Sequence, residues 1–431
     1  MNDPIGISPT RETMQRSIAT STATDEIAED SHRAIRAPGT PAGVALLTGG
    51  NDRPYALGLA SALAAQRIFL DFVGSDALDS PDLHNSPFIR FLNLRGDQSE
   101  QASLKTKVSR LLTYYARLIY YVAVSRQKIL HILWNNKFEF FDRVVLMLYY
   151  RLLGKRTVFT AHNVNAAKRD GKDSLLNHLT LKFQYGMSGH IFVHTERMKR
   201  ELLEDFKVHG DKVTVIPFGI NNTIPTTEMT TLEAKQRLGL CPDEKTVLFF
   251  GQIAPYKGLE YLVGAMAELV KRNRVPRLII AGKVKQGYTE YWEQIRSGIA
   301  STGIKNHVIE RIQFIPDREV ELYFKAADVA ILPYTNIFQS GVPFLAYSFG
   351  LPIIATDVGA LRDDVVEAET GFICKARDHL DLSKSIECYF SSELYRRLEA
   401  RRQEIKKFAS DRYSWTKVGE MTRDVYTRLV R

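Results

Sequence analysis

Two polar loops, each set between a short apolar run and the start of a predicted helix, could bind an anion. The first covers residues 339–342, Gln-Ser-Gly-Val, after the buried-strand pattern of residues 329–332. Ser340 is a favourable N-cap residue, and Pro343 in the first turn lacks an N–H that would otherwise stay unpaired. Unpaired backbone N–H groups and the helix dipole attract phosphate at a helix start. The loop therefore predicts a phosphate site, although an ordinary strand-to-helix turn fits the same residues.

The second loop runs from Gly251 to Gly258 and contains Lys257 at the predicted start of the next helix. A lysine ammonium at this position can serve as a point charge for phosphate. The spacing is not that of a P-loop, and no GxGxxG sequence follows a predicted strand, which disfavours nicotinamide and flavin cofactors. A solvated surface lysine is the alternative interpretation of Lys257.

His162 follows the fifth predicted strand, at the sheet edge where α/β proteins bind ligands. It could hydrogen bond to a sugar hydroxyl or another substrate oxygen, although a lone histidine at such a place is more often structural. No GxSxG elbow accompanies it, which disfavours hydrolase chemistry. Because the chain also lacks an Asp-x-Asp sequence, we expect no metal. Backbone amides, Lys257 and a helix dipole would then neutralise a bound diphosphate.

The composition is that of a globular chain of two domains, with 431 residues, 45% hydrophobic and 25% charged. The net charge of +9 favours acidic partners, namely phosphates, nucleic acid or an anionic membrane face. Nucleic acid is disfavoured because no recognition motif or compact basic arm is present. The 3 cysteines are widely spaced, and the chain has neither a transmembrane-length apolar run nor a signal-peptide layout at its start. These features favour a cytoplasmic protein.

Short apolar runs alternate with helical stretches along most of the chain, which predicts open parallel sheets covered by helices on both faces. The first series of predicted strands covers residues 44–48, 68–73, 89–94, 129–134, 157–161, 190–194 and 213–217. The second series covers residues 247–250, 278–281, 312–315, 329–332, 353–356 and 372–374. This α/β pattern predicts two tandem, doubly wound, Rossmann-like domains with a ligand cleft between their facing strand ends.

The boundaries of these domains follow from shifts in composition. We expect a disordered tail over residues 1–40, which are rich in Ser, Thr, Asp and Glu. The N-terminal domain is predicted over residues 41–218, and a polar linker with a short helix over residues 219–243. The C-terminal domain is predicted over residues 244–410. Residues 411–431 should form a helix that packs back on the N-terminal domain.

Residues 103–128 form a long predicted amphipathic helix that has two interpretations. Its apolar residues share one face at helical spacing, and lysines and arginines flank them. The apolar residues are Leu104, Val108, Leu111, Leu112, Tyr115, Leu118, Ile119 and Val122. The helix either packs in the core of the N-terminal domain with a solvated basic rim, or rests on anionic lipid at the inner face of the membrane.

Residues 43–425 resemble the retaining, nucleotide-sugar-dependent glycosyltransferases of family 4, which have the GT-B fold. The resemblance lies in the order and spacing of several short pieces. They are Gly49-Gly50, residues 160–164 (TAHNV), residues 215–219 (VIPFG), Gly251 with Lys257-Gly258, residues 280–282 (IAG), residues 340–342 (SGV) and residues 356–359 (TDVG).

The resemblance implies that the C-terminal domain binds the donor diphosphate and that the N-terminal domain binds the acceptor. The implied catalytic residues are His162, which contacts the transferred sugar, and Lys257, which holds the diphosphate. The implied donor-binding residues are Gly49, Gly50, Gly251, Gln252, Gly282, Lys283, Ile315, Gln339, Ser340, Gly341 and Val342. No cofactor or metal is implied besides the nucleoside-diphosphate sugar itself.

The chain departs from this family pattern around the donor site. Family members often place Arg where this chain has Gln252 or Ala254, and glutamates where it has Ile337 and Leu345. Subgroups with Gln-Ser-Gly at the place of residues 339–341 also lack these glutamates. We therefore expect a variant donor site.

The predicted function is transfer of a sugar from a nucleoside-diphosphate sugar to an acceptor hydroxyl with retention of configuration, in polysaccharide or glycolipid assembly. Two alternatives remain open at this point. One is a sugar-nucleotide epimerase of the same fold, and the other is a non-catalytic subunit that binds a nucleotide sugar. The acceptor would be a sugar, a lipid-linked group or another hydroxyl compound.

Overall fold

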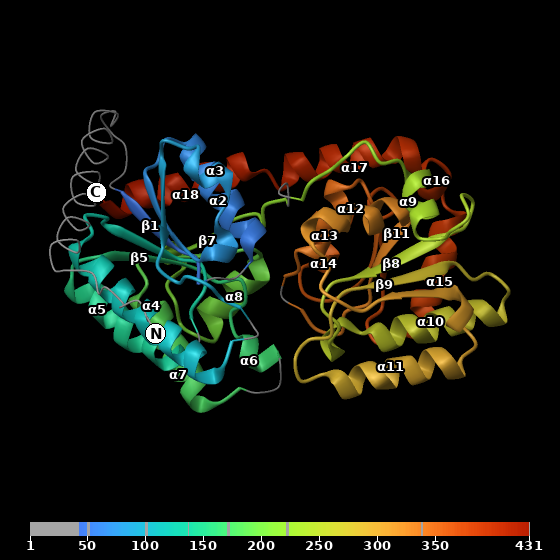
Figure 1. Ribbon diagram of the computed structural model, residues 1–431, viewed down its shortest axis with the longest axis horizontal. Helices are drawn as coiled ribbons and strands as arrows, with labels where there is room; N and C mark the ends of the chain where they lie inside the picture. Colours follow the sequence, from blue (N-terminus) through green and yellow to red (C-terminus); the bar gives the residue numbers. More distant parts are fainter. Residues whose placement is uncertain are drawn as a thin grey trace, which may run out of the picture.

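Two α/β domains lie next to each other in the computed structural model, each built on one parallel sheet (Figure 1). The structure describes residues 43–49, 52–99, 102–136, 138–169, 173–220, 224–337 and 339–430. The predicted tail and Gly50 lie outside the described residues. The predicted architecture of two doubly wound domains is confirmed.

The N-terminal sheet has seven strands in the order β3-β2-β1-β4-β5-β6-β7, and the paired strands are parallel. The strands are β1 (Val44–Leu47), β2 (Leu70–Gly74), β3 (Ile89–Asn93), β4 (Ile129–Ile132), β5 (Arg156–Thr160), β6 (His190–Val193) and β7 (Val213–Val215). The direction in which strands are added reverses between β1 and β4. The carboxyl ends of these two strands are therefore the switch point of this domain.

Helices cover both faces of this sheet, as the near-continuous apolar strands require. One face is covered by η1 (Asp76–Leu78), α2 (Arg53–Ala65), α3 (Pro81–His84) and α18 (Trp415–Val430). The other face is covered by α4 (Leu104–Val124), the π-helical turn η2 (Phe141–Leu146), α5 (Met147–Leu152), α7 (Leu175–Met187) and α8 (Glu196–Glu204). The short elements α6 (Ala166–Arg169) and η3 (Gly210–Lys212) complete the domain.

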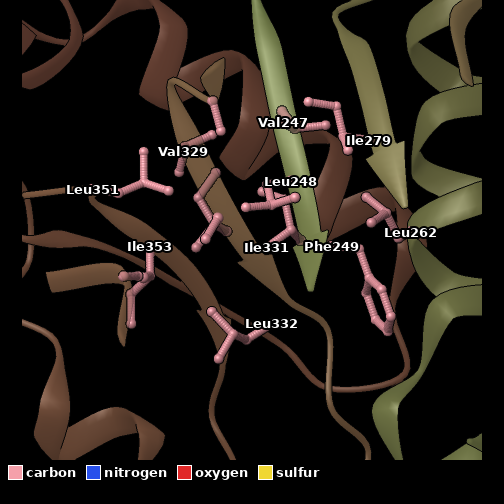
Figure 2. Close-up of a cluster of buried hydrophobic side chains, with 14 of the residues drawn as sticks. Val247, Leu248, Phe249, Leu262, Ile279, Val329, Ile331, Leu332, Leu351 and Ile353 are labelled. Atoms are coloured by element: carbon pink, nitrogen blue, oxygen red, sulfur yellow. The ribbon is translucent and has the colours of Figure 1, made fainter. Parts of the chain in front are cut away.

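The C-terminal sheet has six strands in the order β10-β9-β8-β11-β12-β13, with its switch point between β8 and β11. The strands are β8 (Thr246–Phe250), β9 (Arg277–Ala281), β10 (Val308–Arg311), β11 (Val329–Leu332), β12 (Ile353–Thr356) and β13 (Gly371–Cys374). Figure 2 shows part of the core of this domain, where side chains of β8, β9 and β11 pack on one another and on α10.

The helices of the C-terminal domain lie on both faces of its sheet (Figure 1). They are α9 (Thr231–Arg237), η4 (Pro255–Lys257), α10 (Leu259–Lys271), α11 (Thr289–Ser301), η5 (Lys305–His307), α12 (Asp317–Ala326), α13 (Val342–Ser348), α14 (Leu361–Asp364), α15 (His379–Ser391), α16 (Glu393–Arg396) and α17 (Leu398–Arg412). A capping box between Thr230 and Glu233 starts α9, and Ala234 of this helix is buried in the C-terminal core. The short helix predicted in the linker segment is therefore present, and it packs in that core.

Two segments of the chain cross between the domains and are joined to each other. The Ile220 N–H donates to the Tyr413 carbonyl at 3.0 Å, and the Trp415 indole N–H donates to the Ile220 carbonyl at 2.7 Å. The Trp415 ring lies over Gly58 and Gly219, where an added Cβ would come within 2.3 Å of the ring. From this point α18 packs along α2 of the N-terminal domain (Figure 1).

The predicted strand at residues 312–315 is wrong, because β10 is the preceding segment, Val308–Arg311. Arg311 pairs with Ala281 at the end of β9, and the Gln313 N–H then donates to the Arg311 carbonyl in a turn. The apolar residues of 312–315 imitated a strand, but Phe314 is 66% exposed. They belong to the loop that leads into α12.

Residues 103–128 include the predicted long helix, but only part of its predicted apolar face is buried. Leu118 and Val122 pack in the N-terminal core, whereas Leu104, Val108 and Leu112 are exposed. Every residue from 103 to 109 is exposed, so no neighbouring element covers the first turns of α4. The core interpretation is therefore confirmed for the second half of α4 and wrong for the first.

No helix in the described part of the chain combines the length and the apolarity needed to cross a bilayer. Cys241, Cys374 and Cys388 are all free thiols. Cys374 is buried, whereas the other two are exposed.

Candidate functional site

A cavity of about 340 Å³ lies between the two domains, beside the loops that follow β8 and β11. The N-terminal domain and α18 contribute Asp52, Pro54, Tyr55, Phe218, Gly219 and Trp415. The C-terminal domain contributes Gly251, Gln252, Tyr256, Lys257, Ile337, Gln339, Ser340, Gly341, Val342, Phe344 and Leu345. The cavity thus lies at the switch point of the C-terminal sheet, where open α/β sheets bind their ligands.

Lys257 supplies a buried positive charge to this cavity. Its residue is 7% exposed, and its Nζ donates to the Tyr334 hydroxyl at 2.7 Å. The same Nζ lies 3.9 Å from the centroid of the Tyr334 ring, within cation–π distance. Because little water surrounds the ammonium, its field in the cavity is weakly screened. The predicted position of Lys257 just before a helix is also observed, since it ends η4 and α10 starts two residues later.

Gly258 holds the Lys257 loop against the loop that follows β11. An added Cβ at Gly258 would lie 2.0 Å from the Pro333 carbonyl oxygen, and the φ of +65° is disfavoured for L side chains. The Thr335 N–H donates to the Tyr256 carbonyl at 2.9 Å. The two loops are therefore fixed to each other, which fixes the ammonium relative to the start of α13.

The start of α13 lines the same cavity, with a cap different from the predicted one. The prediction that Ser340 is the N-cap is wrong by one residue, because the first helical hydrogen bond runs from the Leu345 N–H to the Gly341 carbonyl at 3.0 Å, which makes Gly341 the N-cap. The Ser340 hydroxyl still accepts a hydrogen bond from the Val342 N–H at 3.3 Å. Ser340, Gly341 and Val342 line the cavity together with Lys257.

A buried acid orients Gln339 at the edge of the cavity. The Gln339 Nε2 donates to the Asp364 Oδ2 at 3.3 Å, and the Tyr413 hydroxyl donates to the Asp364 Oδ1 at 3.0 Å. Burial raises the pKa of Asp364 to about 7. The Oε1 of Gln339 is buried and has no hydrogen-bond partner among the described groups. It remains available to a ligand that donates a hydrogen bond.

The cavity wall is apolar where the family pattern has glutamates. Ile337 and Leu345 both line it, and each is 7% exposed. Asp52 of the N-terminal domain is the carboxylate among the described lining residues. Within the described residues, no group of three or more His, Cys, Asp or Glu is arranged to hold a metal ion.

His162 lies behind the N-terminal wall rather than on it. Its ring stacks on Trp134 with 4.2 Å between centroids and an interplanar angle of 4°. The ring of Tyr55, which lines the cavity, packs against it nearly at a right angle, with 4.6 Å between centroids. His162 therefore supports the aromatic side of the cleft.

Hydrogen bonds determine which nitrogen of His162 carries a proton. His194 Nδ1 lies 3.3 Å from the Ile216 carbonyl oxygen, which can only accept, so this nitrogen is the donor. Burial lowers the pKa of His194 to about 4, so its ring is neutral and its Nε2 accepts. His162 Nδ1 lies 3.1 Å from that Nε2 and must donate.

The other nitrogen of His162 is consequently an acceptor. Burial, and then the neighbouring His194 and His131, lower the pKa of His162 well below its ordinary value, so the ring is neutral. Its Nε2 carries a lone pair and has no hydrogen-bond partner among the described groups. A ligand at this nitrogen must therefore present a donor, as a hydroxyl group does.

Several predicted donor-binding residues are not among the residues that line the cavity. Gly282 lies against Gly251, where an added Cβ would come 1.9 Å from the Gly251 carbonyl oxygen. The Lys283 carbonyl accepts the Ile253 N–H at 2.9 Å, and Ile315 is 7% exposed near the same sheet edge. In the N-terminal domain, Gly49 has a φ of +63° and its carbonyl accepts a hydrogen bond from the Arg95 guanidinium.

The sequence interpretation missed the aromatic part of the wall and Asp52. The aromatic residues are Tyr55, Phe218, Tyr256, Phe344 and Trp415. Asp52 could have been found from its sequence, because an acid two residues before a proline is a typical helix start, and its Oδ1 accepts the Tyr55 N–H at 3.2 Å. Trp415 gave no signal, since its contact with Ile220 joins residues that are 195 positions apart.

Comparison with known families agrees with the fold. Residues 231–410 match the family described as "Glycosyl transferases group 1", and residues 54–223 match "Glycosyltransferase Family 4". Together the two matches cover most of the chain and support a glycosyltransferase of family 4 and group 1. The group 1 match includes the Lys257 loop and α13.

Among curated relatives, the chain is similar to D-inositol 3-phosphate glycosyltransferases. It is 28% identical to the Nocardia farcinica protein over 241 residues, which are 53% of this chain and 52% of that protein. It is 25% identical to the Corynebacterium glutamicum protein over 341 residues, or 75% and 79% of the two chains. The chain spans about half the length of most curated relatives that it matches.

Among solved structures, the chain is similar to sucrose-phosphate synthase from Thermosynechococcus elongatus. The TM-score is 0.72 at 19% identity, covering 90% of this chain and 99% of that chain. Anabaena Alr3699/HepE, solved in complex with UDP and glucose, gives a TM-score of 0.70 at 16% identity, over 90% and 100% of the chains. These similarities show the GT-B fold.

Proposed function

We propose that this chain, whose two domains match the glycosyltransferases of group 1 and family 4, transfers a sugar from a nucleoside diphosphate to an acceptor hydroxyl with retention of configuration. The observation that carries this proposal is the interdomain cavity, which Lys257 and the start of α13 line together. Its volume, about 340 Å³, is typical of small-molecule sites.

The C-terminal wall is suited to stabilise the leaving diphosphate. As the bond between the sugar and the diphosphate breaks, negative charge grows on the phosphate oxygens and positive charge grows on the sugar. The Lys257 ammonium and the amides of residues 340–342 would meet the negative charge. Because Lys257 is already buried and held by Tyr334, its charge needs little reorganisation during the reaction.

The N-terminal wall is suited to hold neutral, hydroxyl-bearing groups. Tyr55, Phe218 and Trp415 restrict water, and the lone pair on His162 Nε2 calls for a hydroxyl donor. A hydroxyl of the transferred sugar would meet this requirement once it passes the Tyr55 ring, behind which His162 lies. His162 would thus orient the sugar without carrying charge.

Retention needs no separate protein base in this scheme. The new bond forms between the sugar carbon and the acceptor oxygen on the face from which the diphosphate departs. The acceptor proton passes to an oxygen of that diphosphate, which balances the charge. The apolar side chains of Ile337 and Leu345 in the cavity wall agree with a reaction that uses no carboxylate at those positions. No metal step is required.

The donor and the setting of the reaction are part of the proposal. A structural neighbour solved with UDP-glucose makes a UDP-sugar the first donor to test. The family resemblance favours a role in polysaccharide or glycolipid assembly in the cytoplasm. No observation favours an epimerase, and the non-catalytic alternative is tested by turnover.

A thermal-shift screen with UDP, GDP and dTDP tests the proposal first. A nucleotide that binds the folded chain at about 100 times its Kd should stabilise it by about 2.7 kcal/mol, and one nucleotide should stand out. Incubation of the matching sugar nucleotide with acceptors should then yield a product whose anomeric configuration, read by NMR, equals that of the donor. Inversion would contradict retention, and an epimer formed without acceptor would indicate an epimerase. Nucleotide binding without turnover across an acceptor panel would indicate a non-catalytic subunit.

A further inference from the structure

We propose that the outer surface of α4, η2, α5 and α7, here called the α4–α7 face, docks on an anionic lipid bilayer. It carries most of the large apolar side chains that are exposed among the described residues. They are Leu104, Val108, Leu112, Tyr120, Val124, Phe138, Phe140, Val145, Leu148, Leu152, Leu153, Leu175, Leu176 and Leu179. Elsewhere in the described chain, Leu232, Phe314 and Leu380 are the exposed residues of this kind. Such a concentration marks an interaction surface.

The helices of this face form one continuous layer on the N-terminal sheet. The Tyr149 hydroxyl of α5 donates to the Ile119 carbonyl of α4 at 2.8 Å. Arg143 of η2 donates to the Asn177 side chain of α7 at 2.8 Å. The inward side chains of the layer share one core cluster with the strands, so the exposed ones point away from the sheet.

On α4 the exposed apolar residues follow a four-residue spacing along the whole helix. They are Leu104, Val108, Leu112, Ala116, Tyr120 and Val124. A helix of 21 residues is about 30 Å long at 1.5 Å per residue. The line is therefore long enough to lie along a membrane surface, and it is too polar on its flanks to cross one.

The charge around this line is complementary to anionic lipid. Residues 101–138 contain no Asp or Glu, whereas Lys105, Lys107 and Arg117 are exposed beside the apolar line. Apolar side chains at the headgroup boundary and basic side chains near lipid phosphates are the usual combination for surface-bound helices. A two-fold contact with a second copy would instead bring like charges together, so lipid is the occupant that the charges favour.

The α4–α7 face is connected to the N-terminal switch point. Tyr114 of α4 lies beneath the Arg95 guanidinium, 4.6 Å from ring centroid to Cζ. Arg95 in turn donates to the Gly49 carbonyl at the end of β1. A chain docked by this face would hold the β1 loop close to the bilayer, where a lipid-linked hydroxyl could reach the cleft. The docking itself does not depend on the proposed function.

Vesicle flotation with the full chain tests this inference. The chain should float with vesicles of phosphatidylcholine that contain about one-third phosphatidylglycerol, and not with pure phosphatidylcholine. Binding should weaken by about tenfold or more as salt rises from about 0.01 M to 0.15 M, because the Debye length falls from about 30 Å to about 8 Å. Failure to bind anionic vesicles at low salt would overturn the inference.

Matched variants separate this face from general stickiness. L104Q/L112Q should weaken vesicle binding by about tenfold or more, because two leucines no longer enter the apolar boundary. The control F314Q/L380Q changes exposed apolar residues of the C-terminal domain and should bind like wild type. Removing one positive charge near the lipid should weaken binding by about fivefold. K105E/K107E reverses two such charges and should therefore weaken binding by more than about 25-fold. Equal binding by all variants would overturn the inference.

Self-association is the competing use of the same face. Sedimentation of wild type and L104Q/L112Q without lipid distinguishes self-association from lipid docking. The variant should fold, because both replaced leucines are exposed. A monomer in both cases, with vesicle binding lost in the variant, supports lipid docking. If wild type is a dimer that does not bind vesicles, and L104Q/L112Q is a monomer, the face contacts a second copy and the inference is overturned.

Discussion

The two domains share a strand order around their switch points, but the side chains there differ in kind. In the C-terminal domain the loops after β8 and β11 bring a buried ammonium, Lys257, next to the start of α13. In the N-terminal domain the corresponding loops bring Gly49, held by Arg95, and Trp134, stacked on the neutral His162. The two domains thus place their loops at equivalent switch points, and the residues in each loop decide the chemistry there. Under the proposed function, the charged wall holds the diphosphate and the neutral wall holds the sugar.

Removing the cation should give the largest effect. Lys257→Ala should lower kcat by about 10²–10³, because one donor to the developing charge is lost in a site with little water. Steady-state kinetics at saturating donor measure this change. The control is Lys271→Ala, which removes an exposed lysine paired with Glu268 on the same domain. A nearly unchanged kcat in Lys257→Ala would contradict the claim that the C-terminal wall differs from the N-terminal wall by supplying a catalytic positive charge.

The rigidity of the charged wall can be tested at a glycine. Gly258→Ala should lower the free energy of unfolding by about 3 kcal/mol or more, because a left-handed alanine costs about 1–2 kcal/mol and its Cβ would overlap the Pro333 carbonyl. Gly239→Ala is the control, since Gly239 has a φ of +73° but no atom within 4 Å of an added Cβ. It should cost only the backbone strain. Equal shifts in the urea unfolding midpoints would mean that the two loops are not fixed to each other.

The two walls should also differ in their response to pH. Asp364 has a pKa of about 7 in the folded chain, above that of an exposed carboxyl, so the folded state binds the extra proton. Its contribution to stability is therefore present below about pH 4 and is lost as pH rises through about 7. Between about pH 5 and about pH 7 the loss should be about 2 kcal/mol, and Asp364→Asn should remove it.

Urea unfolding of wild type and Asp364→Asn at the two pH values measures this difference. The N-terminal wall should respond in the opposite direction, because burial keeps His162 and His194 neutral in the folded chain while the unfolded chain protonates them below about pH 6.5. Their contribution to stability should therefore rise, in both proteins alike, as pH increases from about 5 to about 7. If the stability difference between wild type and Asp364→Asn is the same at both pH values, Asp364 does not titrate as the geometry indicates.

The smallest expected effect concerns the neutral wall. His162→Phe should lower kcat/KM for the sugar nucleotide by about fivefold to tenfold, since one neutral hydrogen bond is worth about 1 kcal/mol. It should leave the affinity for the free nucleoside diphosphate unchanged. Nitrogen-15 NMR of the wild-type protein should show an unprotonated Nε2 in His162. A protonated Nε2 would contradict the hydrogen-bond direction through His194.

The sequence was sufficient for the positions of the loops but not for their partners. The sequence could predict that Lys257 and Ser340 share one cavity, because each follows a short apolar strand and the strand order of doubly wound sheets is regular. The segment 312–315 misled because its apolar residues imitate a strand next to the true one, Val308–Arg311. Spacing alone could not show which turns of α4 have a neighbour to pack on.

The contacts that tune the site are long-range and have no local pattern. His194 orients His162 across 32 positions, and Tyr413 holds Asp364 across 49. Each of these residues would fit many other roles when seen in sequence. The wrong N-cap at Ser340 differs by one residue from the observed Gly341, because both types are accepted at a helix start. Local rules therefore locate such a site more easily than they describe its hydrogen bonds.

The affinity difference between a nucleoside diphosphate and its monophosphate tests the central claim most directly. Isothermal titration of wild type and Lys257→Ala with both ligands, using the base selected by thermal shift, isolates the contact with the second phosphate. We predict that wild type prefers the diphosphate by at least about tenfold and that Lys257→Ala loses most of this preference while binding the monophosphate almost normally. A variant that keeps the full preference would contradict the claim that the C-terminal wall holds the diphosphate through this amine.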